Sequence, residues 1–379
     1  MTMNGRTAFI LLLIGAAVIT AARSGHELPI YPSYYPHEIE IRTVTPQHAA
    51  GLLLDGKIHA YVGRAPHFDA ATPDSIGAVE SLGSFVLVRV NPASPLAKDE
   101  RSACTIAEAV IREIARSGGE VIFHPYPVTP LHGDYLNHAD LADAAKTRLR
   151  SEAPAAANLK VRAAGRLAKS LLRPDWIAKD PQWDAEIAEI DVAELVGGAT
   201  ATMNGWLGPP WVRSGWFQAH LLLRGTVDVA AKDRVEADLQ KLESGAYQDP
   251  VERLNLERQL VTALVAGCRT MVAGYSVKRE YFNAEFSAGV ENIAYDALEG
   301  LRSPIFIRTV KLKDFPWNGW LALGIDARPA AAWNPIAGFS DEFGRLTWSA
   351  VADPAVLPSP YGSEWMLNRI SEVQSNKKR

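Results

Sequence analysis

The amino-acid sequence predicts an α/β protein with a largely parallel sheet, flanking helices and two lobes, preceded by an N-terminal hydrophobic helix. Strand-like and helix-like patterns alternate between residues 39 and 123, as they do in layered α/β folds. The chain has 379 residues, which exceeds the size at which a single hydrophobic core usually stops growing. An apolar run over residues 8–22 precedes the alternating region.

In the first region, β-branched strands alternate with helices that have recognisable ends. Thr45 and Pro46 suit the N-cap and the first position of a helix, and Gly56 suits its end. Thr105 and Glu108 form a capping-box pattern ahead of an apolar stripe. We expect strands at residues 39–44, 58–63, 84–90 and 120–123. This alternation implies parallel pairing.

The remainder of the chain is more helical in pattern and richer in tryptophan. Asp249 and Pro250 mark the start of an expected helix that continues to residue 275. Other patterns predict a helix over 184–196, a basic amphipathic helix over 159–176, and strands over 216–225, 304–314 and 319–325. The basic helix suits an anionic lipid surface or an acidic partner, and it equally suits the solvated face of an ordinary domain helix.

These patterns divide the chain into four predicted parts. Residues 1–23 are a signal peptide or a membrane anchor, and residues 24–38 are a Pro/Tyr-rich tether. Residues 39–150 form an α/β domain, and residues 151–379 form a second, more helical α/β domain with Trp-rich loops.

Composition excludes one broad class of function. With a net charge of -4 and an isoelectric point near 6.2, the chain has no basic excess to neutralise phosphates, which argues against a nucleic-acid binder. Its 47% hydrophobic and 22% charged residues are ordinary for a soluble globular protein.

The N-terminal segment indicates where in the cell the protein is located. Its apolar run is at the upper limit for a signal peptide and just below the usual length of a membrane span. Both alternatives place the rest of the chain outside the cytoplasm. We expect a periplasmic protein, either released or anchored to the inner membrane by residues 7–23. Cys104 and Cys268 are far apart in sequence and each lies beside or within an expected helix, so we expect two buried free thiols.

Histidines cluster at the ends of the expected strands. His67 and Asp69 follow one strand, and His124 directly follows another, with Tyr126 beside it. In open parallel sheets, ligands bind at the carboxyl ends of strands, so these side chains are predicted to line a ligand site. The loop continues with His132, Asp134 and His138, which together with His124 form a candidate site for a divalent metal.

The spacing of this loop does not match a zinc signature, because strong zinc motifs place paired ligands two to five residues apart. A ligand-lining or purely structural loop is therefore the main alternative to a metal site. A second constellation is aromatic: Trp206, Trp211, Trp317 and Trp320 occur in Gly/Pro-rich loops, where they suit a stacked ligand, a partner interface or a seam between domains.

The segment over residues 38–66 resembles the opening of a periplasmic solute-binding protein of the ABC-transporter type. In that family a strand and a helix lead to a phrase ending Gly-Lys-Ile-Asp-Ala, and here Gly56-Lys57-Ile58-His59-Ala60 follows Leu54-Asp55. His59 stands where the family has an acidic residue. The resemblance implies two α/β lobes that close on a small solute, export to the periplasm and a transporter as partner.

Three functions follow from these features. The first is an exported, non-enzymatic binding protein for a small solute or a metal. The second is an accessory subunit docked on a membrane protein complex, with the N-terminal segment, the tether and the Trp-rich loops as its contacts. The third is a metal-dependent hydrolase that uses the histidine loop. No complete catalytic signature occurs in the sequence, so we prefer a binding role to an enzymatic one.

Overall fold

The structure is a computed structural model, and it shows a mixed α/β fold. The predicted signal peptide or anchor lies outside the described residues, as does the predicted tether apart from Tyr34 and residues 36–38. Within the described part of the chain, no helix has both the length and the apolar character needed to cross a membrane. The described residues are 34, 36–150, 159–178, 182–200, 209–317, 319–330, 341–352 and 355–372.

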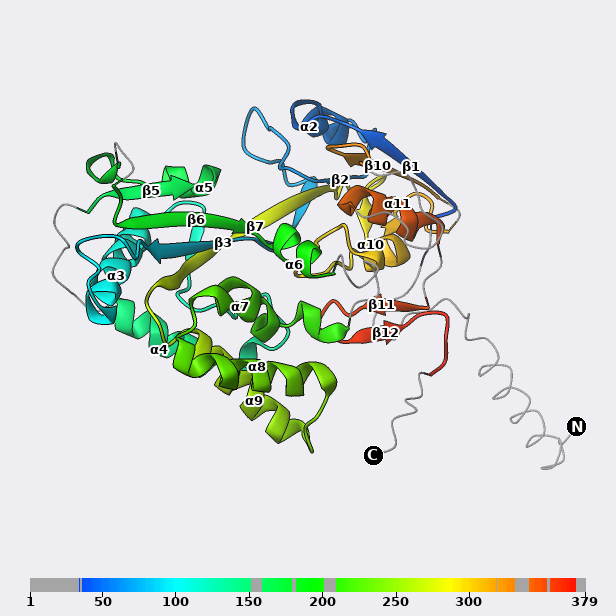
Figure 1. The fold of residues 1–379 in the computed structure, drawn as a ribbon. Helices are drawn as coiled ribbons and strands as arrows, with labels where there is room; N and C mark the ends of the chain where they lie inside the picture. The colour runs from blue at the N-terminus through cyan, green and yellow to red at the C-terminus, as the bar shows by residue number, and fades with distance from the viewer. Residues whose placement is uncertain are drawn as a thin grey trace, which may run out of the picture.

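An eight-stranded sheet runs through the molecule (Figure 1). Parallel pairs occur towards its two ends, at β1–β10, β10–β2 and β6–β5, whereas the four pairings in its centre are antiparallel. The expected largely parallel sheet is therefore corrected to a mixed one. In spatial order the strands are β1 (Glu38–Thr43), β10 (Trp320–Ile325), β2 (Ala60–Val62), β7 (Thr270–Asn283), β3 (Ile76–Val90), β6 (Ala185–Asp191) and β5 (Val161–Ala164), with β4 (Val121–Phe123) paired to β7.

Strand β7 is the centre of this sheet. One of its edges pairs with β3 from Thr270 to Asn283, interrupted by two register shifts. Its other edge pairs with β4 around Tyr275 and with β2 around Tyr281. Gly274 is required at the β4 contact, because a Cβ there would lie 2.3 Å from the carbonyl oxygen of Ile122. Strands β2, β3 and β4 are therefore all held by this one long strand.

The sheet draws strands from both predicted domains. β1, β2, β3 and β4 precede residue 150, and the other four strands follow it. The predicted boundary between residues 150 and 151 adjoins residues 151–158, which lie outside the described part of the chain. The division into two domains and two lobes stays a prediction.

Helix α3 (Glu100–Ser117) covers the end of the sheet formed by β3, β6 and β5. Its stripe of Ile106, Val110 and Ile114 is buried against Val88 and Ile187 of the sheet. The helix begins six residues earlier than the Thr105 pattern predicts, because Asp99 is its N-cap. The Asp99 carboxylate accepts a hydrogen bond from the Ser102 amide, and the Ser102 hydroxyl accepts one from the Asp99 amide.

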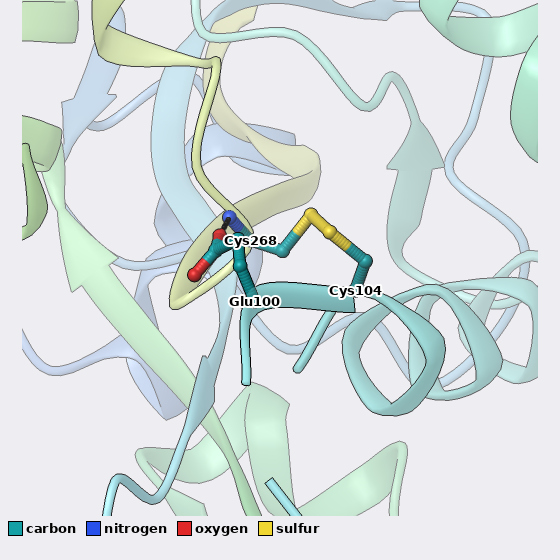
Figure 2. Close-up of side chains that lie close together, drawn as sticks. All are labelled: Glu100, Cys104 and Cys268. Carbon is teal, nitrogen blue, oxygen red and sulfur yellow. Dashed lines mark hydrogen bonds between the residues drawn. A yellow bond between two sulfur atoms is a disulfide. The ribbon is translucent and has the colours of Figure 1, made fainter. Parts of the chain in front are cut away.

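A disulfide ties α3 to the start of β7. Cys104 of α3 and Cys268, two residues ahead of β7, are bonded, so the expectation of two free thiols is wrong. Figure 2 shows the Glu100 carboxylate beside this bridge, where it accepts a hydrogen bond from the Cys268 amide at 2.5 Å. The sulfur atoms bond each other, so this group of side chains offers no thiolate to a metal. Local patterns did not predict this pairing, because the two cysteines are 164 residues apart in the sequence.

Helices α7, α8 and α9 form a helical layer beneath the sheet in the view of Figure 1. Trp216, Leu239 and Leu260 are among the side chains that this layer buries. Helix α9 starts as predicted, since the Asp249 carboxylate accepts hydrogen bonds from the Val251 and Glu252 amides. It ends near residue 264 rather than 275, because the following residues enter β7. The helices are α4 (Ala139–Arg150), α7 (Gly215–Leu223), α8 (Val229–Ser244) and α9 (Pro250–Leu264).

The other end of the molecule combines helices with a small hairpin. Helix α2 begins at Pro46 as predicted, and Gly56 takes a positive φ of 66° just beyond its end. The core here includes Phe306, Leu323 and Phe343. The elements are α2 (Pro46–Leu54), α6 (Val192–Thr200), α10 (Pro304–Thr309) and α11 (Glu342–Val351), with short antiparallel pairs of β8 (Val290–Glu291) and β9 (Lys311–Leu312), and of β11 (Val356–Pro358) and β12 (Trp365–Leu367).

Several local predictions are wrong. The expected strand over 216–225 is mostly helix α7, and the expected helix over 184–196 is β6 followed by α6. Residues 304–314 begin as helix α10 rather than as a strand. The expected basic helix over 159–176 is β5, a short helix α5 (Arg166–Ser170) and a 3-10 turn (Pro174–Trp176).

Candidate functional site

The loop that follows β4 is folded onto itself by its own histidines. The ring of His124 hydrogen-bonds through Nε2 to the carbonyl oxygen of Val128 at 2.8 Å. The Nδ1 atom of His132 accepts from the Thr129 amide at 2.9 Å, and its Nε2 atom lies 3.0 Å from the Gln218 side-chain oxygen. Both rings are buried, and these contacts hold the loop in shape.

Burial keeps these rings neutral. It lowers the pKa of His124 to about 4, and it also lowers the pKa of His132 and of His138. The Asp134 carboxylate acts in the opposite direction on the pKa of His132 and His138, but burial is the larger effect at both. Neutral imidazole is the form that accepts a metal or a hydrogen bond.

Two of the four predicted metal ligands come together, and they do so with a carboxylate that the sequence did not indicate. Asp134 and His138 meet Glu257 of α9, with one ligand atom of each within 4.8 Å of the others. His124 and His132 are engaged with the partners given above and are not members of this group. Glu257 is distant in sequence and lies on an amphipathic helix, where a core-facing glutamate gives no local signal.

The predicted convergence of histidines at strand ends does not occur. The chain leaves β2 at Gly63, beside Glu280 of β7, whereas His124 follows β4 beside Ala273. Seven residues of β7 separate these points, which is about 23 Å along a strand. His67 and Asp69 lie exposed in the loop after β2, and the His67 amide bonds to Pro46. Their predicted role in ligand binding stays a prediction.

The predicted aromatic ligands are also separated. Trp211 packs on Trp216 and Phe217, with ring centroids 6.1 and 4.7 Å apart. Trp317 and Trp320 are exposed. Tyr126 is buried, and its hydroxyl lies 3.1 Å from Nδ1 of His138. Trp206 lies outside the described residues.

A cavity of about 160 Å³ lies between helices α6, α10 and α11 and the β11–β12 hairpin. Its wall is mainly apolar and includes two tryptophans and several aliphatic side chains. Charged residues lie at intervals around it. Its apolar lining residues include Val192, Val196, Leu298, Trp348, Val356 and Trp365.

A second cavity of about 230 Å³ adjoins the first, and Arg213 and Leu298 line both. One wall is the loop after β4, through residues 130–133, and the opposite wall is the segment 359–362 that joins β11 to β12. The histidine loop therefore does reach a cavity, with residues 130–133 in place of the predicted His124 and Tyr126.

Arg213 is the charged group between the two chambers. Its guanidinium forms an ion pair with Asp296, which is wholly buried, and donates hydrogen bonds to the carbonyl oxygens of Ser359 and Gly362. Burial lowers the pKa of Arg213. These contacts fix the guanidinium in place, so a polar group with a set orientation lines both cavities.

Arg302, another cation that lines the first cavity, is also paired. Arg302 forms an ion pair with Glu342 on α11 and approaches Glu280 at 4.0 Å. The cavities thus carry balanced charges on apolar walls. Such a site can hold a small solute with an apolar body and a neutral or zwitterionic polar end. Sequence analysis missed these residues because they come from segments spread between positions 130 and 365.

Comparisons with known proteins give only distant matches. No protein-family model matches the chain, and no curated protein matches it. Among solved structures, it is similar to NikZ from Campylobacter jejuni in complex with Ni(L-His), at 13% identity and a TM-score of 0.35 over 66% of this chain and 56% of that one.

Two further structures match to the same degree. One is the oligopeptide-binding protein AppA from Bacillus subtilis, with 14% identity, a TM-score of 0.36, and coverage of 71% of this chain and 59% of that one. The other is a nickel ABC transporter structure from Bacillus halodurans, with 10% identity, a TM-score of 0.39, and coverage of 65% and 57%. The chain spans less than three fifths of the length of each of these three structures. At these values the comparisons place it in no family.

Proposed function

We propose that this chain is an exported, non-enzymatic protein that binds a small solute in the two adjoining cavities beside Arg213. The observation that carries the proposal is the cavity pair itself: a mainly apolar first cavity adjoins a more polar second one, and the fixed guanidinium of Arg213 lines both. Binding sites for small molecules commonly combine an apolar lining with a few oriented polar groups. The expected solute has an apolar body and a carboxylate or carbonyl group directed at Arg213.

Export is supported by two features of the chain. An apolar run occupies residues 8–22, and a disulfide joins Cys104 to Cys268. Disulfides persist in oxidising compartments such as the periplasm and are rare in the cytoplasm. We propose a periplasmic location, either free or anchored by residues 7–23, with a membrane transporter or another membrane complex as partner.

The test is a thermal-shift screen of the purified full chain against amino acids, short peptides and aromatic carboxylates. A solute at one hundred times its Kd stabilises the native state by about 2.7 kcal/mol. For a chain of 379 residues the unfolding entropy is about 0.8 kcal/mol per kelvin, so the Tm rises by about 3 °C.

A cavity-filling variant makes this test specific. Ala193 lines the first cavity, and Ala193→Phe places a ring in the space that the solute would occupy. It is expected to abolish the shift, while Ala230→Phe on the exposed surface of α8 keeps it. If no solute raises the Tm, or if Ala193→Phe responds as the unmodified chain does, these cavities are not the binding site.

A second candidate function is supported by a separate observation. Phe315, Trp317 and Trp320 are exposed by 64, 67 and 70% within six residues of chain, and the ring of Tyr34 lies 5.6 Å from Trp317. Clustered exposed aromatic side chains are typical of partner interfaces. We propose docking on a membrane complex as the alternative role. A mild-detergent pull-down tests it: a stoichiometric partner that is lost with Trp317→Ser and Trp320→Ser supports docking, and the same yield with both chains refutes it.

A further inference from the structure

A buried cluster of metal-ligand side chains joins the loop after β4 to helix α9. Asp134 and His138 come from the loop, and Glu257 comes from the third turn of the helix. Their exposed fractions are 7, 0 and 1%. One ligand atom of each lies within 4.8 Å of the others, although Glu257 is 119 residues beyond His138 in the sequence. The cluster lies apart from the residues that line the two cavities.

Surrounding groups hold each member of this cluster in place. The two Asp134 oxygens accept hydrogen bonds from the amides of Gly215 and Trp216 at the start of α7, at 2.8 and 3.1 Å. The Tyr126 hydroxyl fixes the His138 ring through Nδ1 at 3.1 Å. One oxygen of Glu257 pairs with Arg253 at 2.7 Å. The geometry is therefore built by three separate segments of the chain: the loop after β4, the start of α7 and helix α9.

These contacts leave one strong ligand atom without a partner. Among the described residues, the Nε2 atom of His138 is buried and makes no hydrogen bond. A buried polar atom left unpaired costs about 1–3 kcal/mol. The cluster also brings two carboxylates together, and the single guanidinium of Arg253 offsets only one of them. The missing component is a positive charge that can also accept the nitrogen lone pair.

We propose that Asp134, His138 and Glu257 bind one divalent transition-metal ion, for which zinc is the best match. One imidazole and two carboxylates are a ligand set that zinc accepts. In a tetrahedral zinc site, two ligand atoms that are each about 2.1 Å from the ion lie about 3.4 Å apart. The ligand atoms of this cluster lie within 4.8 Å of one another, so side-chain shifts of up to about 1.4 Å complete the site. Tyr126 then acts as the outer group that orients the His138 ring, as hydrogen-bonded partners do at most metal-bound histidines.

The role of this ion would be to fasten the helical layer to the sheet. It would connect the loop after β4, which continues from the sheet, to α9, while Asp134 also holds the start of α7. Gly215 allows this close packing, because a Cβ there would lie 2.5 Å from Val128 of the same loop. Residues 130–133 of the loop line the second cavity, so the ion would also set the position of that wall.

The test uses the full chain without a polyhistidine tag, stripped of metal with a chelator and titrated with Co²⁺ as a spectroscopic probe. We expect one equivalent to bind, with visible absorption bands that Zn²⁺ abolishes and a rise in Tm with either ion. Glu257→Gln and His138→Gln are expected to weaken Co²⁺ binding at least tenfold. Glu236→Gln, on the exposed face of α8, is the matched control and should bind as the unmodified chain does.

His124→Gln separates this site from the one that the loop spacing predicts. It removes a ring that hydrogen-bonds to the Val128 carbonyl oxygen and does not belong to the cluster, so Co²⁺ binding should persist. Binding that is lost with His124→Gln and retained with Glu257→Gln would overturn the proposal. Less than a tenth of an equivalent bound to the unmodified chain would also overturn it, and this measurement holds even if a variant does not fold. Solute binding at Arg213 is tested separately and does not enter this result.

Discussion

The disulfide between Cys104 and Cys268 is expected to be a major source of stability. The perturbation is the double variant Cys104→Ser and Cys268→Ser, which keeps two small polar side chains in place of the bridge. The bridge closes a loop with a sequence separation of 164 residues, joining α3 to the start of β7. Without it, the unfolded chain regains the freedom that this closure removes.

The loop length sets the size of the effect. In the chain-entropy treatment a closed loop of 164 residues lowers the entropy of the unfolded state by about 17 cal/mol/K, or about 5 kcal/mol at 25 °C. An unfolding entropy of about 0.8 kcal/mol per kelvin for 379 residues converts this into a fall in Tm of about 6 °C. The Glu100 hydrogen bond to the Cys268 amide remains in the variant and limits any change in the native structure.

The assay is a thermal melt followed by far-UV circular dichroism, with thiol titration of the folded chain. The unmodified chain under non-reducing conditions should show no reactive thiol and the higher Tm. The same chain after reduction should melt with the double variant. A double variant that melts within 1 °C of the oxidised chain would refute the loop-closure reasoning, and so would two titratable thiols in the native oxidised protein.

Three further changes test other contacts. Glu280→Gln removes the charge of a buried carboxylate that pairs with half-buried Lys278 at 3.0 Å, so it should destabilise the chain by about 3–5 kcal/mol in urea unfolding; a loss below 0.5 kcal/mol would contradict this. Gly274→Ala drives a Cβ into the Ile122 carbonyl and should cost about 1–3 kcal/mol while speeding amide exchange in β4; unchanged exchange would oppose it. Burial lowers the pKa of His124 to about 4, and its unfolded value is about 6.5, so the unfolded state binds the proton first and stability should fall by about 3 kcal/mol as the pH drops from 6.5 to 4. The loss should shrink in His124→Gln, and equal pH profiles for both chains would show that another group titrates.

Local signals predicted the elements whose ends the sequence marks. Asp249 and Pro250 started α9, and Thr45 and Pro46 started α2, because side-chain and φ preferences act within one turn. The strand over 216–225 was wrong for the opposite reason. Helix α7 is buried almost all round, so its apolar residues lack the helical stripe that periodicity detects.

Local patterns did not predict which strands pair. The pattern over residues 184–196 was interpreted as a helix, but the first half lies between β3 and β5, where neighbours on both edges decide its conformation. Parallel or antiparallel pairing depends on which strands meet. β7 comes from the second half of the chain and separates β2 from β3, which excludes a simple run of parallel units.

The candidate sites were also predicted only where local sequence patterns indicate them. Reading along the chain identified the loop after β4, because a strand end rich in His and Asp suits a ligand, and two of its residues belong to the buried cluster. Glu257 and most of the cavity lining were not identified, because they come from helices and turns at separate positions along the chain, between residues 192 and 365. The histidine ring partners also depend on side-chain rotations that spacing does not encode.

The position of β7 has a consequence for the order in which the protein can be built. Strands β1 to β6 are synthesised first. However, β2, β3 and β4 pair with β7, which ends at Asn283, and β1 pairs with β10, which ends at Ile325, so these pairings can form only later. A nascent chain with its first two hundred residues out of the ribosome therefore has several unpaired strand edges. Such edges pair readily with other chains. We expect this protein to depend on chaperones that keep the early segments apart until its last third has emerged.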